Sequence, residues 1–265
     1  MEFTRPTGRG ADGKVRAADG KVRSALRLSS RWRMGAHRGG RRGEGARRDP
    51  LRRFPELFIL ICATERSGST TLQRIINTIE ESNINGENWG AINNLLECYK
   101  NIKKTNKEPW CYRTYVEGKT KIKPSWYNCF DFENVKNNIK NTILSIITND
   151  NSKKVVGFKE IRYLKKTYLI DEFIELFPNT KVICHIDDNI DRQCTSAWLK
   201  KKENSKEYLT EKNNELINYS KSNKNCYLSY MKNLFIINEI KKMFEFLGQE
   251  LDEEKYNYII NNSLE

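Results

Sequence analysis

Several features that define common enzyme classes are missing from this 265-residue sequence. Histidine occurs only at His37 and His185, which argues against a histidine-based metal site and against a Ser-His-Asp triad. The seven cysteines form no CxxC pair, and their odd number argues against a complete disulfide framework. We therefore expect no metal centre, and we expect a reducing compartment such as the cytoplasm.

Long apolar stretches are also missing. No run reaches the roughly eighteen apolar residues that a membrane-spanning helix needs, and no apolar segment near the amino terminus has the form of a signal peptide. We therefore expect a soluble chain without a membrane span.

The basic residues are concentrated at one end of the chain. Residues 1–53 contain 16 Lys and Arg against 5 Asp and Glu, whereas residues 54–265 contain 31 against 29. The first segment is rich in Gly and Arg and has few large apolar residues, so it cannot bury enough surface to offset its ordering entropy. We predict a disordered basic leader over residues 1–53 and one folded domain over residues 54–265.

Three interpretations of this leader remain open. It could bind nucleic acid or another anionic surface through its charge, act as a transit-like targeting segment, or be an upstream extension without a role. A nucleic-acid-binding arm usually carries aromatic residues for stacking, and only Trp32 is present. We favour the third interpretation and expect no nucleic-acid partner.

The most informative stretch begins at Leu57. A continuous apolar run, LFILICA, is followed by a polar turn, TERSGSTT, and then by apolar residues at helical spacing. This pattern predicts a buried strand, a tight loop and a helix, similar to the arrangement of a P-loop. The start of such a helix offers backbone N–H groups and the positive end of the helix dipole, so we expect it to bind an anion.

The loop itself supplies further groups that suit an anion. Gly68 allows the backbone to close around a phosphate, and Arg66 provides a fixed positive charge. Hydroxyl donors are present at four more positions, Ser67, Ser69, Thr70 and Thr71. The usual nucleotide loop requires Lys after its second Gly, and the absence of that Lys argues against a metal-assisted ATPase or kinase. An ordinary strand-to-helix turn is the alternative.

Strand-like and helix-like stretches alternate through the remaining chain. We predict further strands at 154–158, 180–186 and 226–229, a turn at 83–88, and helices at 89–104, 132–147, 168–177, 189–202, 206–221, 231–247 and 252–262. The alternation predicts a three-layer α/β fold with a central parallel sheet and helices on both faces.

Ligands of such folds bind at the carboxyl ends of the strands. Four polar clusters are expected there: residues 64–71, 86–88, 159–160 and 187–196. They combine cations and backbone donors, which can hold an anionic group, with carboxylates, which can take a proton from an acceptor.

Residues 64–71 resemble the 5′-phosphosulfate-binding loop of sulfotransferases, whose usual form is PRSG[ST]T followed by a helix. Later segments are similar to further blocks of that family in the same order: NGENWGAINNLLECY, KPSWYNCFD, VVGFKEIRY, CHIDDNIDRQCTSAW, and YLSYMKNL with FEFLGQELDEE. The resemblance covers roughly Leu57 to Ile260, and the order of the blocks carries much of its weight.

The resemblance implies that a sulfuryl group is transferred from the co-substrate 3′-phosphoadenosine 5′-phosphosulfate (PAPS) to a hydroxyl or amine, in line and without a metal. The acceptor could be a small molecule, a carbohydrate or a protein. By the same resemblance, Arg66 and residues 67–71 hold the 5′-phosphosulfate, Glu87 is the general base, and Lys159 steadies the transferring group. The alternatives are a helix-capping carboxylate at Glu87 and a solvated ion pair between Lys159 and Glu160.

The sequence departs from the family in its 3′-phosphate block. The family has Arg at the end of the strand and Ser eight residues later, where this chain has Asp187 and Thr195, followed by Ser196. A carboxylate facing a phosphate costs on the order of 1 kcal/mol or more in a partly solvated site. Arg192 or Arg162 could compensate, with Thr195 and Ser196 as further ligands. A weakened or inactive nucleotide-binding relative is therefore the alternative function.

Two groups of residues receive simpler interpretations. His185 lies in a predicted buried strand and is expected to be a hydrogen-bonded core residue and not a base. Aromatic residues that could line an acceptor pocket, but that more often belong to a core or its rim, are Trp89, Trp110, Tyr112, Trp126 and Tyr127.

Overall fold

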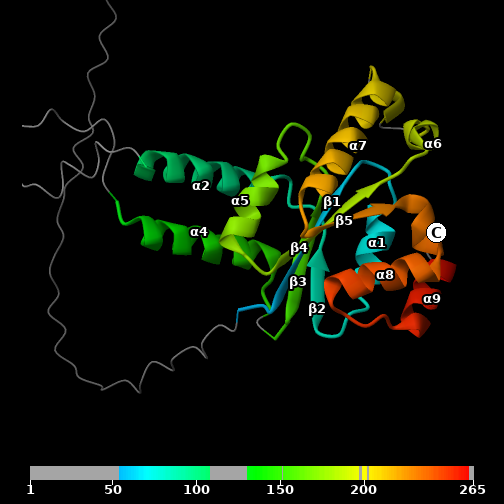
Figure 1. Cartoon of the computed structure of the whole chain (residues 1–265), viewed down its shortest axis with the longest axis horizontal. Coiled ribbons are helices and arrows are strands. Elements are labelled where there is room, and N and C mark those ends of the chain that lie inside the picture. Colours follow the sequence, from blue (N-terminus) through cyan, green and yellow to red (C-terminus); the bar gives the residue numbers. More distant parts are fainter. Residues whose placement is uncertain (1–53, 108–129, 151, 197–198, 202, 263–265) are drawn as a thin grey trace, which may run out of the picture. The chain divides into compact units, whose positions relative to one another are not determined.

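The computed structural model describes residues 54–107, 130–150, 152–196, 199–201 and 203–262 (Figure 1). The predicted leader, residues 1–53, lies outside the described residues. The same holds for four of the aromatic candidates, Trp110, Tyr112, Trp126 and Tyr127.

A five-stranded parallel sheet forms the centre of the described domain. Its strands are β1 (Leu57–Ala63), β2 (Ser82–Asn85), β3 (Val155–Glu160), β4 (Thr180–Ile186) and β5 (Cys226–Tyr230), in the order β2-β3-β1-β4-β5. The apolar run LFILICA is the middle strand, and Phe58 lies opposite Val156 on one side and Thr180 on the other. The predicted parallel α/β sheet is confirmed.

Helices cover both faces of the sheet (Figure 1). They are α1 (Ser69–Ile76), α2 (Ala91–Lys107), α4 (Phe132–Ile147), α5 (Tyr168–Leu176), α6 (Ile190–Cys194), α7 (Ser205–Ser222), α8 (Ile237–Leu247) and α9 (Glu253–Asn262), with 3₁₀ turns η1 (Leu199–Lys201) and η2 (Met231–Phe235). Because side chains alternate along β1, Phe58, Leu60 and Cys62 pack with α2, α4, α5 and α7, whereas Ile59 and Ile61 pack with α1, α8 and α9. The three layers are therefore confirmed.

The observed helix limits agree closely with the predicted limits where a capping residue or a proline sets them. Asp131 caps α4, because its carboxylate accepts a hydrogen bond from the backbone N–H of Asn134 at 3.0 Å. The predicted helix at 189–202 is wrong in length, since α6 ends at Cys194 and η1 follows it.

Within the described part of the chain, no helix is both long enough and apolar enough to cross a bilayer.

The predicted turn at residues 83–88 is partly wrong, because Ser82–Asn85 forms the edge strand β2. Its sequence, SNIN, is polar, and Ile84 is its only buried residue. The side chain of Asn77 stabilises this strand: it donates to the carbonyl of Ile84 at 2.9 Å and accepts from its N–H at 2.7 Å. As a result, residues 86–88 follow a strand and reach the same edge of the sheet as the loop after β1.

Candidate functional site

The loop between β1 and α1 has a backbone that suits the approach of an anion. Gly68 has φ +79° at the start of α1, and a Cβ there would lie 2.1 Å from the sulfur of Met231, so only glycine fits. Arg66 also has a positive φ, 59°, and its side chain is exposed. No side chain caps the start of α1. The first N–H groups of this helix therefore have no partner from a capping side chain.

Buried hydrogen bonds fix this loop from within the protein. The hydroxyl of Ser67 donates to the carbonyl of Thr64 at 2.7 Å, so it is engaged inside the protein. The amide of Gln193 donates to the carbonyl of Glu65 at 2.6 Å. His185 donates from Nε2 to the carbonyl of Ser67 at 2.7 Å, and its Nδ1 lies 3.1 Å from the hydroxyl of Ser229. His185 is thus a satisfied core histidine, as predicted.

Burial of this imidazole has a consequence for stability. It lowers the pKa of His185 to about 4, against small opposing effects from the Ser67 carbonyl and Asp187. Between about pH 6.5 and pH 4 the unfolded chain therefore binds a proton that the folded chain does not. We expect this group to remove about 3 kcal/mol of unfolding free energy as the pH falls through that window. Urea unfolding at several pH values measures the slope.

The matched control is His185→Gln, whose amide can still donate to Ser67 but does not titrate. We expect its unfolding free energy to depend less steeply on pH below 6.5 than that of the parent. Equal slopes in the two proteins would mean that other groups, and not His185, account for the acid sensitivity.

A cavity of about 720 Å³ opens at the carboxyl ends of the strands. Its lining residues are Glu65, Arg66, Gly68, Ser69, Thr70, Glu87, Trp89, Lys159, Ile161, Arg162 and Arg192. Arg162 and Trp89, which the sequence analysis also named, are thus in the lining. Of the eleven catalytic and donor-binding candidates, the structure brings together seven: Arg66, Gly68, Ser69, Thr70, Glu87, Lys159 and Arg192. The four others do not line it: Ser67 is buried, Thr71 is half-buried, and Thr195 and Ser196 directly follow α6.

Paired charges lie at the base of the cavity. Glu87 contacts Lys159 at 2.9 Å through one carboxylate oxygen and Arg162 at 3.1 Å through the other. Arg162 also contacts the fully buried Glu160 at 2.6 Å. The solvated pair of Lys159 with Glu160 that the sequence suggested is therefore wrong, because both side chains are buried and each has a different partner. Glu87 does not cap α2 either, since Asn88 accepts the N–H of Ile92.

The carboxylate of Asp187 is buried and neutralised locally. It accepts the N–H of Asn189 at 3.0 Å and the Nε of Arg192 at 2.9 Å, and it also forms an ion pair with the Nη2 of Arg192. The same guanidinium reaches the carbonyl of Arg66 at 3.1 Å and lines the cavity. Asp187 thus holds Arg192 beside the loop. The hydroxyl of Thr195 donates to the carbonyl of Arg192 at 2.7 Å.

Sequence reasoning missed a buried ion pair behind the loop. Glu65 contacts Lys212 of α7 at 2.8 Å and accepts a hydrogen bond from Tyr208 at 2.8 Å. Only 2% of Lys212 is exposed. A signal was present, because Lys212 lies at helical spacing from Leu209 and Leu216 on the buried face of α7. A lysine on an apolar face calls for a buried anionic partner.

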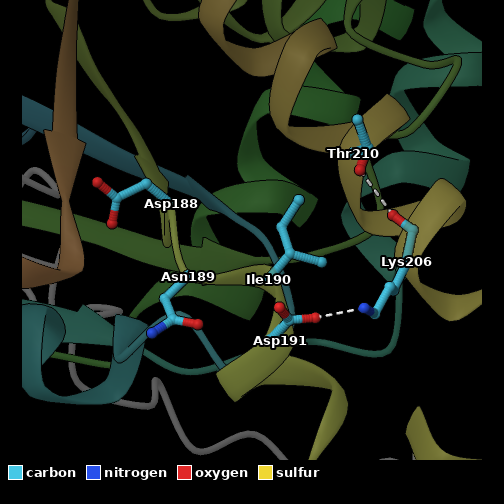
Figure 2. Close-up of a pocket in the computed structure, with 6 residues that line it drawn as sticks. All are labelled: Asp188, Asn189, Ile190, Asp191, Lys206 and Thr210. Carbon is cyan, nitrogen blue, oxygen red and sulfur yellow. Dashed lines mark hydrogen bonds and ion pairs between the residues drawn. The ribbon is translucent and has the colours of Figure 1, made fainter.

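A second cavity, of about 450 Å³, lies between α6 and α7. Figure 2 shows Asp191 turned toward Lys206, and the two side chains form an ion pair at 2.5 Å. Asp188, at the same hollow, pairs with Lys232. The described lining of this second cavity has one cationic side chain and two carboxylates, so the first cavity is the stronger candidate for an anionic ligand. It combines four cationic side chains with two carboxylates and the start of α1.

The parallel sheet and this cavity define an α/β protein with a strand-loop-helix motif beside a cavity lined by four cationic side chains. Residues 59–231 match the model of the sulfotransferase family, and the chain belongs to that family. The comparison with curated proteins found no match.

Three solved structures to which the chain is similar are a sulfotransferase and two sulfotransferase domains. The sulfotransferase domain from the curacin biosynthetic pathway has 15% identity and a TM-score of 0.45, with 77% of each chain covered. The domain from the olefin synthase of Synechococcus PCC 7002 has 13% identity and a TM-score of 0.43, with 78% of each chain covered. A sulfotransferase from Alicyclobacillus acidocaldarius has 10% identity and a TM-score of 0.42, with 75% of this chain and 83% of the other covered.

Proposed function

We propose that this protein transfers a sulfuryl group from PAPS to a hydroxyl or amine acceptor. The observation that carries the proposal is the convergence of the loop after β1, Glu87, Lys159 and Arg192 on one cavity. PAPS is strongly anionic, and cations together with the start of a helix favour such a ligand. Arg66 is the cation of this set for which the described residues provide no ion-pair partner.

In this reaction the side chains and the loop backbone of the cavity each have a role. The acceptor oxygen or nitrogen forms a bond to sulfur while the bond from sulfur to the 5′-phosphate oxygen breaks, and that oxygen keeps the bonding electrons. Glu87 takes the proton of the acceptor as general base. Arg66, Gly68, Ser69, Thr70 and the backbone of Ser67 and Thr71 hold the 5′-phosphosulfate, and Lys159 balances charge on the transferring group.

We assign the 3′-phosphate of the donor to Arg192, with Thr195 and Ser196 nearby. In this proposal Asp187 is a positioning residue, because its carboxylate orients the guanidinium of Arg192 and does not face the phosphate. A chain with Asp187 in place of the family's Arg can then still present a cation to the donor.

Calorimetric titration with the product 3′-phosphoadenosine 5′-phosphate (PAP) tests this proposal. We expect Arg66→Ala to weaken binding about 10- to 100-fold, the effect of one charge-assisted contact to a phosphate. We expect Asp187→Ala and Arg192→Ala to weaken it by similar factors, and the double variant to be no weaker than either single variant. No PAP binding by the parent chain would contradict the proposal.

The alternative is a nucleotide-binding relative without transfer activity, which the replacement of the family's Arg by Asp187 favours. The sign of the Asp187→Ala effect separates the two cases. If the carboxylate repels the donor, Asp187→Ala binds PAP more tightly than the parent does. Binding of PAP without sulfuryl transfer to a mixed acceptor panel would support the alternative.

A further inference from the structure

Trp89 is unusually placed for a large aromatic residue. Its side chain is 88% exposed, and it lines the cavity that contains Glu87 and Lys159. Of the interpretations that the sequence offered for Trp89, the structure agrees with a residue that lines a cavity and not with burial in the core. Its backbone has φ 56°, a conformation in which a bulky residue is strained. An indole held in a strained conformation and open to water has no evident role in packing.

This indole has a cationic neighbour. The guanidinium of Arg162 lies against it, 5.3 Å from the ring centroid, and is itself held by Glu87 and Glu160. The turn that carries Trp89 is closed on one side by the bond from Ala91 N–H to the carbonyl of Asn88 at 3.1 Å. We call the indole of Trp89 and the guanidinium of Arg162 the aromatic platform. It lies two residues from Glu87.

The remaining lining of the cavity indicates what the platform can bind. Apart from Trp89, Ile161 is the one large apolar side chain among the described lining residues, and the others, except Gly68, are charged or carry hydroxyls. A phenol or a lipid chain calls for an apolar slot that covers most of its surface. A sugar ring instead offers a C–H face, which suits the negative face of an indole, and a rim of hydroxyls, which suits carboxylates and cations.

We propose that the aromatic platform binds the acceptor and that the acceptor is a carbohydrate. This inference rests on the proposed function. The sugar ring stacks on Trp89 and one of its hydroxyl oxygens attacks the sulfur of PAPS, while Glu87 takes the proton and PAP leaves with the bonding electrons.

The test uses the full chain saturated with PAP, which makes a complex that binds acceptor without turnover. Saturation-transfer NMR is recorded with cellotetraose, chitotetraose, maltotetraose and N-acetyllactosamine, and separately with 2-naphthol and a tyrosine heptapeptide. We expect at least one saccharide to bind, and we expect Trp89→Ala to weaken it about tenfold or more while Trp89→Phe retains part of the affinity. PAP affinity, measured by calorimetry, changes less than about twofold.

Tyr258→Ala is the matched control, because Tyr258 is 70% exposed on α9 and does not line the cavity. It should leave saccharide binding unchanged. Binding of no saccharide by the PAP-saturated protein, or binding of only the two aromatic probes, would overturn the inference. Equal saccharide affinity in Trp89→Ala and in the parent would also overturn the inference. Failure of the parent to bind PAP would instead contradict the proposed function.

Discussion

Replacing Lys212 by Met lowers the free energy of unfolding by about 3–5 kcal/mol, the cost of leaving one member of a buried ion pair without its partner. The ammonium group of Lys212 is the cation that contacts the carboxylate of Glu65 at 2.8 Å. In the variant, Glu65 keeps its hydrogen bond from Tyr208 but loses its counter-charge in a site shielded from water. Denaturant unfolding followed by fluorescence measures the change.

Two further variants identify the cause of that loss. Lys206→Met removes an exposed lysine from the same helix, and we expect little change because its partner Asp191 is also exposed. Glu65→Gln combined with Lys212→Met removes both charges, and we expect it to be more stable than Lys212→Met alone. If the double variant is the less stable one, lost packing and not the unpaired carboxylate destabilises the protein.

Replacing Glu87 by Gln lowers kcat for sulfuryl transfer about 10²- to 10⁴-fold, the usual contribution of a general base. The amide keeps the shape of the side chain, and its single oxygen can accept from one of the two cations, Lys159 or Arg162, but it cannot take the acceptor proton. We expect PAP affinity to change little, so the loss falls on the chemical step. Steady-state kinetics with saturating PAPS measure it.

The control for Glu87→Gln is Glu133→Gln, which removes an exposed carboxylate from the first turn of α4. Its kcat should equal that of the parent. A decrease of less than about tenfold in Glu87→Gln would assign the base to another carboxylate. Glu65 is then the next candidate, because it lines the cavity and its Oε2 is buried without a hydrogen-bond partner among the described residues.

The sequence was sufficient to predict the parts of the fold that depend on local pattern. The strand Thr180–Ile186 and the helix Phe132–Ile147 have the predicted limits, because a short, mostly apolar stretch after Pro178 defines the first and a capping aspartate starts the second. The edge strand Ser82–Asn85 was not predictable in this way. Its hydrogen bonds to β3 and to Asn77 form it, and polar residues at a sheet edge leave no apolar pattern to detect.

The site was predictable as a set of residues but not as a set of contacts. The rule that strand ends meet at one edge correctly grouped Arg66, Glu87, Lys159 and Arg192. Alternation along β3 turns the neighbours Lys159 and Glu160 to opposite faces, but the rule could not reveal that Lys159 pairs with Glu87, which lies in the loop after β2. Nor could it reveal that the carboxylate of Asp187 turns toward Arg192.

The central position of β1 also determines when this strand can pair with its neighbours during synthesis. Its neighbours, β3 and β4, are synthesised long after it, and its apolar side chains find no strand partner until residues 155–186 have left the ribosome. Such distant pairings slow folding and leave apolar segments open to aggregation. The LFILICA segment is therefore expected to be the part of the nascent chain that most needs a chaperone, although its residues 58–63 are all buried in the finished domain.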